Sequence, residues 1–177
     1  MTPYLFETRR LGFGLWSESD LPLTLSLWGD PAVARFICAA GRFTPAEVEG
    51  RLALEMNNYR KYRVQYFPLY LLEDGAFVGC CGLRPYGAKK DVFELGVHLL
   101  EPFWHKGIAR EAAHAMIHYA FSFLHATQLR AGHHPDNTSS QQLLLRLGFQ
   151  YIGDEFYPPT GRMHPAYRLD HIPDIKH

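Results

Sequence analysis

Two ionisable side chains, Glu94 and His98, interrupt an otherwise apolar run from Val92 to Leu100. Successive side chains of a strand point to opposite faces, so a strand here would place both on one face. A carboxylate or a neutral imidazole there can accept a proton from a reacting group. The run therefore predicts a strand with one apolar face packed on a helix and a second face open to a cleft. The apolar face holds Phe93, Leu95, Val97 and Leu99, and the other holds Glu94, Gly96, His98 and Leu100.

A candidate anion site follows this strand. The segment Pro102–Ala115 turns through Lys106-Gly107 and opens a helix whose apolar residues recur about every 3.6 positions. A helix N-terminus presents unpaired backbone N–H groups and the positive end of the helix dipole, which together suit a pyrophosphate. The alternative is an ordinary strand-to-helix turn that contains one glycine.

A second loop-to-helix segment runs from His134 to Phe149. Asp136 or Asn137 can accept from free N–H groups as the N-cap residue. Gly148 suits the left-handed position at which many helices end. The sequence therefore predicts a short helix over Ser139 to Leu147.

The two segments together resemble the GNAT superfamily of acyl-CoA-dependent N-acyltransferases. The resemblance rests on Trp104-His-Lys-Gly-Ile-Ala109 and on Asn137-Thr-Ser-Ser140 followed by Leu147-Gly-Phe149. It extends from about residue 5 to about residue 170. Within the superfamily, the chain is most similar to the branch that acetylates ribosomal-protein N-termini. That closer likeness adds the segments Phe6–Leu11, Asp30–Val33 and Gly79–Gly82.

This resemblance implies that acetyl-CoA is the acyl donor and CoA the product. It implies that the backbone of Val97, His98 and Leu99 pairs with the pantetheine arm of the cofactor. It also implies that Asn137 and Ser140 lie near the cofactor sulfur. The Ser140 hydroxyl would there protonate the leaving thiolate. The pyrophosphate would be bound through His105, Lys106, Gly107, Ile108, Ala109 and Arg110. Trp104 and His105 depart from the wider superfamily, which often has Gln or Arg at the first position and Gly at the second.

Acyl transfer needs a neutral amine, a polarised carbonyl and a stabilised thiolate. Deprotonating an α-amino group near pH 7 costs roughly 1 kcal/mol, against roughly 4.6 kcal/mol for lysine, so a weak base suffices for an N-terminus. Glu94 is the first candidate for that base, with His134 or His98 as runners-up, and N–H groups of the splayed strand would form an oxyanion hole.

Each catalytic candidate also has a structural interpretation. Glu94 could pair with Arg84 or a lysine, and His98 could be a half-buried strand residue. His134 precedes Pro135 and could only shape the loop, and Ser140 could be a plain first-turn cap. The aromatic residues Tyr59, Tyr62, Tyr66, Phe67 and Tyr70 are expected mainly in the core or on a helix surface. Some of them could instead line an acceptor pocket with Phe156, Tyr157 and Met163.

Strand and helix signals alternate along the chain. We predict a single α/β (α+β) domain of the GNAT type over residues 1–177. Its mixed, strongly twisted sheet carries helices on both faces and, as the resemblance implies, splays between the fourth and fifth strands. The predicted strands are Thr8 to Trp16, Phe67 to Leu72, Ala76 to Leu83, Val92 to Leu100, Leu129 to His133, Tyr151-Ile152 and Ala166 to Leu169, with a loop at Pro158–Gly161. The predicted helices are Asp20 to Trp28, Thr44 to about Tyr62, Gly107 to Leu124 and Ser139 to Leu147.

Composition limits the partners. The chain has 177 residues, of which 47% are hydrophobic, and its 18 basic and 18 acidic residues give a net charge of zero. No global field therefore attracts nucleic acid or an anionic membrane. Neither an apolar run long enough to span a bilayer nor a signal-peptide pattern is present. The three cysteines do not form a disulfide framework. We expect a cytoplasmic protein that binds neither nucleic acid nor membrane.

Ten histidines raise the question of a metal. The close pairs His133-His134 and His114/His118 each offer only two ligands, and no acidic or cysteine cluster completes them at the usual spacing. We therefore expect no metal.

The sequence predicts an acetyl-CoA-dependent N-acetyltransferase acting on a protein N-terminus. The alternatives are a small-molecule amine or antibiotic as acceptor, or a non-catalytic acyl-CoA-binding module. Residues 20 to 62 and 154 to 165 would select the acceptor, but they contain no motif that identifies it. Glu47, Glu49 and Glu55 would either form an acidic acceptor groove or lie on a solvated helix face. Either a monomer or a homodimer is compatible with the sequence.

Overall fold

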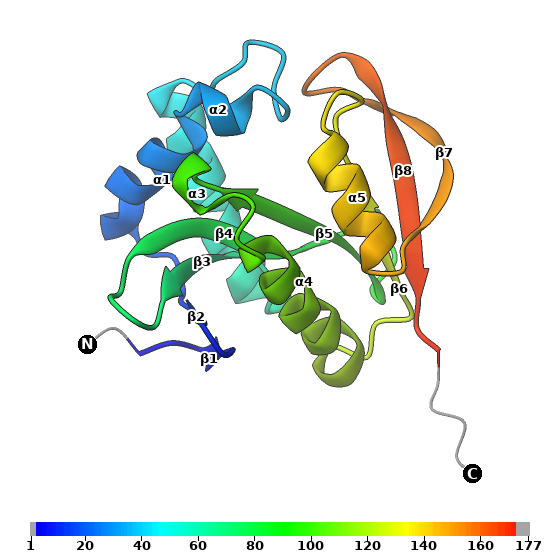
Figure 1. The fold of residues 1–177 in the computed structure, drawn as a ribbon, viewed down its shortest axis with the longest axis horizontal. Helices are drawn as coiled ribbons and strands as arrows, with labels where there is room; N and C mark the ends of the chain where they lie inside the picture. The colour runs from blue at the N-terminus through cyan, green and yellow to red at the C-terminus, as the bar shows by residue number, and fades with distance from the viewer. Residues whose placement is uncertain (1–2, 173–177) are drawn as a thin grey trace.

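A computed structural model describes residues 3–172, which form an eight-stranded mixed sheet in the order β1-β2-β3-β4-β5-β6-β8-β7. All neighbouring strands are antiparallel except β5 and β6, which are parallel. Figure 1 shows the sheet running through the molecule between helices. The strands are β1 (Phe6–Glu7), β2 (Leu11–Phe13), β3 (Tyr66–Leu71), β4 (Phe77–Pro85), β5 (Val92–Leu99), β6 (Gln128–Gly132), β7 (Gln150–Tyr157) and β8 (Arg162–Asp170).

Local signals in the sequence set the helix boundaries. Helix α3 begins where predicted because Thr44 forms a capping box with Glu47: the Glu47 N–H donates to the Thr44 hydroxyl, and the Thr44 N–H donates to the Glu47 carboxylate. Pro22 lies in the first turn of α1, where a missing N–H is tolerated. The helices are α1 (Leu21–Trp28), α2 (Pro31–Ala34), α3 (Pro45–Tyr62), α4 (Ile108–His118) and α5 (Thr138–Arg146), and a π-helical turn over Tyr119–Phe123 extends α4.

The predicted first strand over Thr8 to Trp16 is wrong in its extent. The chain turns sharply after Glu7, and β1 and β2 then pair with each other, Phe6 opposite Phe13. Glu111 of α4 stabilises this turn, because its carboxylate accepts from the Thr8 hydroxyl at 2.6 Å and from the Arg10 N–H at 2.8 Å. A partner about a hundred residues away along the chain gives no local signal.

Two differences concern the second half of the sheet and the first helices. The last two strands are longer than predicted and form a hairpin around the expected loop at Pro158–Gly161. Helix α2 was not predicted as a helix. Asp30 caps it by accepting from the Ala32 N–H at 2.9 Å.

Apolar side chains cover both faces of the sheet. On one face, Leu95 and Leu99 of β5 belong to the same buried cluster as Ile108, Ala112 and Met116 of α4, as predicted for the apolar face of this strand. On the opposite face, Leu27 and Trp28 of α1 and Val48 and Leu52 of α3 pack with Tyr66 and Cys80. The adjacent residues Cys80 and Cys81 contribute to opposite clusters, as the alternation of a strand requires.

Strands β5 and β6 separate after a short paired stretch. Their register joins Val92 to Gln128, Phe93 to Leu129 and Glu94 to Arg130, whereas β5 pairs with β4 as far as Leu99. One backbone edge of β5 from Leu95 onwards is therefore not paired to β6. This splay lies between the strands predicted as fourth and fifth, and the predicted α/β fold with a mixed sheet is confirmed.

In the part of the chain that the structure describes, no helix combines the length and apolar character needed to cross a membrane.

Candidate functional site

The candidate site is a cleft of about 760 Å³ that follows the unpaired edge of β5. The start of α4 lines one end, α5 and the β7–β8 hairpin line the opposite side, and α2 reaches its far end. Twelve of the thirteen predicted site residues line it, and Lys106 does not. The twelve are Glu94, Val97, His98, Leu99, His105, Gly107, Ile108, Ala109, Arg110, His134, Asn137 and Ser140.

At the α4 end, the chain is shaped to present backbone N–H groups. His105 and Gly107 both have positive φ values, 58° and 75°. The first N–H of the helix with a backbone partner is that of Glu111, which donates to the Gly107 carbonyl. The N–H groups before it are the unpaired donors of a helix N-terminus, which suit an anion. The positive φ at His105 explains why glycine is common there in the family that the sequence resembles.

The loop before α4 is tied to the N-terminal turn. Arg10 donates from Nη1 to the Lys106 carbonyl at 2.9 Å and from Nε to Glu111 at 2.7 Å. The Lys106 ammonium lies 5.7 Å from the centre of the Phe103 ring, and the side chain is exposed. Glu111 therefore positions the loop before α4 through Arg10. Lys106 takes part in this anchor with its backbone carbonyl and not with its side chain.

Glutamine at position 111 should loosen this anchor. Burial acts to raise the pKa of Glu111, but the hydrogen bonds from Thr8 and Arg10 outweigh it and lower the pKa below its usual value. Because the folded-state pKa of Glu111 is depressed, its carboxylate stabilises the fold at pH values above the unfolded-state pKa. This stabilisation is lost as the pH falls through the folded-state pKa. We expect Glu111→Gln to lower stability by about 1–2 kcal/mol near pH 7. Its difference from wild type in urea unfolding should shrink below about pH 4, since the unfolded-state pKa of Glu is about 4.3; a difference independent of pH would contradict this account.

Two polar residues of the α5 start lie on the other side of the cleft. Asn137 is the N-cap, and its side-chain oxygen accepts from the Ser140 N–H at 3.2 Å. Ser140 is half-buried and lines the cleft. The Asn137 cap fixes the first turn of α5, and with it the direction of the Ser140 side chain.

Glu94 is a half-buried carboxylate on the wall of the cleft. It is not in an ion pair with Arg84, the alternative that the sequence left open, because Arg84 bonds Glu55 instead. Burial raises the pKa of Glu94; Arg84 and Arg130 act to lower it, and Glu155 acts to raise it. A carboxyl with a raised pKa and an open side toward a cleft can accept a proton near neutral pH.

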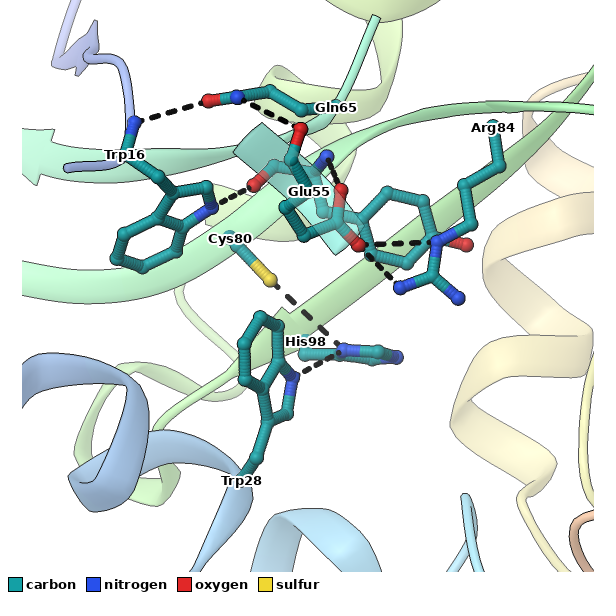
Figure 2. Close-up of polar contacts among 8 residues, drawn as sticks. Trp16, Trp28, Glu55, Gln65, Cys80, Arg84 and His98 are labelled. Atoms are coloured by element: carbon teal, nitrogen blue, oxygen red, sulfur yellow. Dashed lines mark hydrogen bonds and ion pairs between the residues drawn. The ribbon is translucent and has the colours of Figure 1, made fainter. Parts of the chain in front are cut away.

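The Glu55–Arg84 pair lies behind this wall. Glu55 of α3 is fully buried, and besides binding Arg84 it accepts from the Tyr66 N–H at 2.7 Å. Figure 2 shows the Glu55 carboxylate directed at the Arg84 guanidinium. The interpretation of Glu55 as part of a solvated helix face is wrong, as is its place in an acidic groove, because the side chain points into the sheet.

His98 points to the same face but is occupied by structural contacts. Its Nδ1 accepts from the Trp28 indole N–H at 3.0 Å and lies 3.9 Å from the Cys80 sulfur (Figure 2). Burial, with Arg51 and Arg84 nearby, lowers the pKa of His98 well below its usual value. A neutral ring that accepts at Nδ1 carries its proton at Nε2, so His98 has no free lone pair with which to act as a base.

His134 is similarly constrained. Its Nδ1 accepts from the Asp136 N–H at 3.1 Å, and its Nε2 lies 3.3 Å from Arg162 Nη1. Burial and the Arg162 charge lower its pKa. This geometry favours a role in shaping the loop, and it leaves Glu94 as the better placed base.

The far end of the cleft contains residues that sequence reasoning did not single out. Arg130 pairs with Glu155 at 2.7 Å, and Arg162 lies 3.3 Å from Asp136, so most charges here are paired. The sequence offered two broad ranges for this end, residues 20 to 62 and 154 to 165, and three named residues, of which Phe156 and Tyr157 line the cleft and Met163 does not. Further lining residues that were not predicted are Ala32, Arg35, Phe36, Ile37, Tyr86, Arg130, Glu155 and His164.

A main-chain contact joins two segments that contribute lining residues to this end, Ile37 from one and Tyr157 from the other. The Ala39 N–H, in the segment between α2 and α3, donates to the Pro159 carbonyl at the tip of the β7–β8 hairpin at 2.8 Å. Figure 1 shows these two segments approaching each other above the sheet. Among the described residues, no group of three or more His, Cys, Asp or Glu side chains is arranged to hold a metal ion.

Comparisons with known proteins agree with this geometry. A family profile described as Acetyltransferase (GNAT) domain matches residues 10–150. The chain is 32% identical to the uncharacterized N-acetyltransferase YoaA of Bacillus subtilis over 84% of each chain. It is 25% identical to the uncharacterized N-acetyltransferase p20 of Bacillus licheniformis over 90% of this chain and 91% of that protein.

Solved structures share the fold. A GNAT-family acetyltransferase from Bacillus anthracis superimposes with a TM-score of 0.79 at 21% identity, over 93% of this chain and 96% of that one. RimL, a ribosomal L7/L12 α-N-protein acetyltransferase solved in complex with coenzyme A, gives a TM-score of 0.76 at 16% identity, over 96% and 97% of the two chains.

Proposed function

The chain belongs to the GNAT acetyltransferase family, and on that basis we propose that it transfers an acetyl group from acetyl-CoA to a primary amine, in the first place the α-amine of a protein or peptide N-terminus. One observation carries the proposal. A single cleft joins a helix N-terminus suited to phosphates, an unpaired strand edge suited to a pantetheine arm, and a carboxylate suited to deprotonating an amine.

The residues present fit acetyl-CoA. The N–H groups at the start of α4, with Arg110 beside them, would hold the pyrophosphate. The free edge of β5 at Val97 to Leu99 would pair with the amide groups of the pantetheine arm, as a strand pairs with a neighbour. Asn137 and Ser140 face this edge from α5 and would lie near the sulfur. When bound, acetyl-CoA supplies the acyl group as a thioester.

Two residues of the chain would then each take part in one proton transfer. Glu94 accepts the proton that the amine loses, either directly or through one water. Ser140 donates to the departing sulfur, which becomes the thiol of CoA. The amine attacks the acetyl carbon directly while both substrates are bound. An α-amine suits this arrangement because its deprotonation costs only about 1 kcal/mol near pH 7, against roughly 4.6 kcal/mol for lysine.

A small-molecule amine is the second candidate acceptor. The observation that favours it is the Ala39–Pro159 contact, which joins the segment after α2 to the tip of the β7–β8 hairpin. The alternative outside enzymes is a module that binds acyl-CoA without turnover.

A thermal-shift titration with acetyl-CoA, CoA and ATP tests the cofactor assignment. A ligand about 100-fold above its Kd stabilises a fold by about 2.7 kcal/mol, and each kcal/mol raises the Tm of a domain of this size by roughly 2–4 °C. We expect both CoA forms to raise the Tm by several degrees and ATP to have little effect. No shift with either CoA form at millimolar concentration would overturn the proposal.

A further inference from the structure

The side chain of Tyr66 crosses three strands of the sheet and ends at the unpaired part of β5. In the sheet register Tyr66 lies opposite Gly82, and Gly82 lies opposite Gly96. A Cβ atom on Gly96 would overlap the Tyr66 ring and hydroxyl. Gly96 therefore leaves the space in which the phenol from β3 reaches the backbone of β5, just after the residue at which pairing with β6 ends.

Contacts on several sides hold the Tyr66 ring and backbone in place. The Arg84 guanidinium lies 4.2 Å from the ring centre, and the His98 ring meets it edge-on at 5.5 Å. The Tyr66 N–H donates to Glu55, and its carbonyl accepts from the Trp16 indole N–H. A phenol held in this way loses little freedom when it binds a ligand, which is the condition for a preorganised hydrogen-bond donor.

The Tyr66 hydroxyl has no hydrogen-bond partner among the described residues. Although the residue is only 4% exposed, Tyr66 lines the cleft. Within the described chain, the fully buried side-chain nitrogens or oxygens that lack a partner are Arg51 Nε and Arg130 Nε, and the Tyr66 oxygen is not one of them. The hydroxyl is therefore open to the cleft, where a ligand can satisfy it.

We infer that the Tyr66 hydroxyl donates a hydrogen bond to the carbonyl oxygen of the acyl group that is transferred. This inference rests on the proposed function. Glu94 lies two residues before Gly96 on the same face of β5, so the base and the phenol approach the acyl group from one side. Tyr66 would supplement the backbone N–H groups of β5 that the sequence predicts as an oxyanion hole.

The step balances without an additional reactant. The nitrogen lone pair forms a bond to the acetyl carbon, and the carbonyl electron pair moves onto the oxygen that Tyr66 faces. That pair then re-forms the carbonyl as the carbon–sulfur bond breaks. The amine proton passes to Glu94, and the sulfur takes a proton from Ser140. Ser140 regains a proton from Glu94 through water, so both residues return to their starting state. Tyr66 keeps its own proton throughout.

The electrostatic environment of Tyr66 agrees with a donor that does not ionise. Burial raises its pKa well above the usual value for tyrosine, with Glu94 and Glu55 acting in the same direction and Arg84 against them. The phenol therefore remains protonated across the physiological pH range.

Binding of two non-reactive thioethers tests this inference without requiring turnover. S-acetonyl-CoA carries a ketone close to the position of the thioester carbonyl, and S-propyl-CoA has the same chain length without the oxygen. We expect wild type to prefer the ketone, and Tyr66→Phe to lose about 5–10-fold of that preference in calorimetric titrations, the value of one hydrogen bond. Tyr70→Phe is the matched control. It lies on the same strand, outside the cleft lining, and should keep the wild-type preference.

The outcomes separate this inference from the function on which it rests. An unchanged ketone preference in Tyr66→Phe would overturn the role of the hydroxyl while leaving the acetyltransferase proposal intact. A loss in Tyr66→Phe that Tyr70→Phe shares would also overturn it, since the effect would not be specific to the cleft. If wild type binds neither thioether, the proposed function fails and this inference fails with it.

Discussion

Replacing Glu94 with glutamine should lower kcat about a hundredfold near pH 7, because general-base assistance of this kind contributes about 10²–10⁴-fold. Glutamine has nearly the same shape but cannot accept the amine proton. The wild-type pH profile of kcat/KM should fall on the acid side with a midpoint above the usual pKa of a glutamate, since burial raises the pKa of Glu94. That limb should be absent in Glu94→Gln.

Whereas the kcat of Glu94→Gln should fall, the stability of its fold should not. A carboxyl whose folded-state pKa is raised stabilises the fold below its unfolded-state pKa, and this contribution is lost as the pH rises through the folded-state value. The ionised Glu94 is thus unfavourable to the fold at neutral pH, and Glu94→Gln should melt at the wild-type temperature or higher. Glu49→Gln, on the exposed surface of α3, is the control for substitution alone. A Glu94→Gln enzyme with kcat within threefold of wild type would exclude Glu94 as the base.

Replacing Glu55 with alanine should destabilise the fold by about 3–5 kcal/mol, the cost of breaking a buried ion pair by removing one partner. The substitution leaves the Arg84 guanidinium without its carboxylate and the Tyr66 N–H without its acceptor. For a domain of this size, the Tm should fall on the order of 10 °C.

Glu49→Ala provides a matched comparison, since it makes the same change on the same helix at an exposed position. It should alter stability by no more than about 0.5 kcal/mol. Equal effects of the two substitutions in urea unfolding would mean that the Glu55–Arg84 pair does not stabilise this fold. The Glu55–Arg84 pair also contacts a residue of the cleft, because the Arg84 guanidinium packs on the Tyr66 ring and the Glu55 carboxylate accepts from the Tyr66 N–H.

The sequence predicts those parts of the fold whose signals are local. Proline after Thr44 locates the start of α3, the alternation in Val92–Leu99 identifies the helix-facing side of β5, and Gly107 marks the start of α4. The family inferred from Trp104–Ala109 and Asn137–Ser140 is confirmed by the profile over residues 10–150. These features depend on residues within a few positions of one another.

The parts that the sequence does not predict depend on distant partners. Glu111 turns the chain at Thr8, which splits the expected first strand in two. Glu55 has the sequence context of an exposed helix residue, and only the tertiary fold shows that Arg84 and Tyr66 require its charge in the interior. The position of Tyr66 at the cleft depends on the sheet register, which brings its ring to Gly96, where there is no side chain.

The measurement that tests the central claim most directly is thiol release from acetyl-CoA in the presence of a panel of amines, with the products identified by mass spectrometry. The panel should contain a peptide with a free N-terminus, the same peptide blocked at the N-terminus but carrying a lysine, and small aromatic and aliphatic amines. We expect thiol release with the free peptide and an acetyl group on its α-nitrogen. Release with small amines alone would move the acceptor to that class. Release with none of them, from a protein that binds acetyl-CoA, would contradict the claim of catalysis and leave an acyl-CoA-binding module.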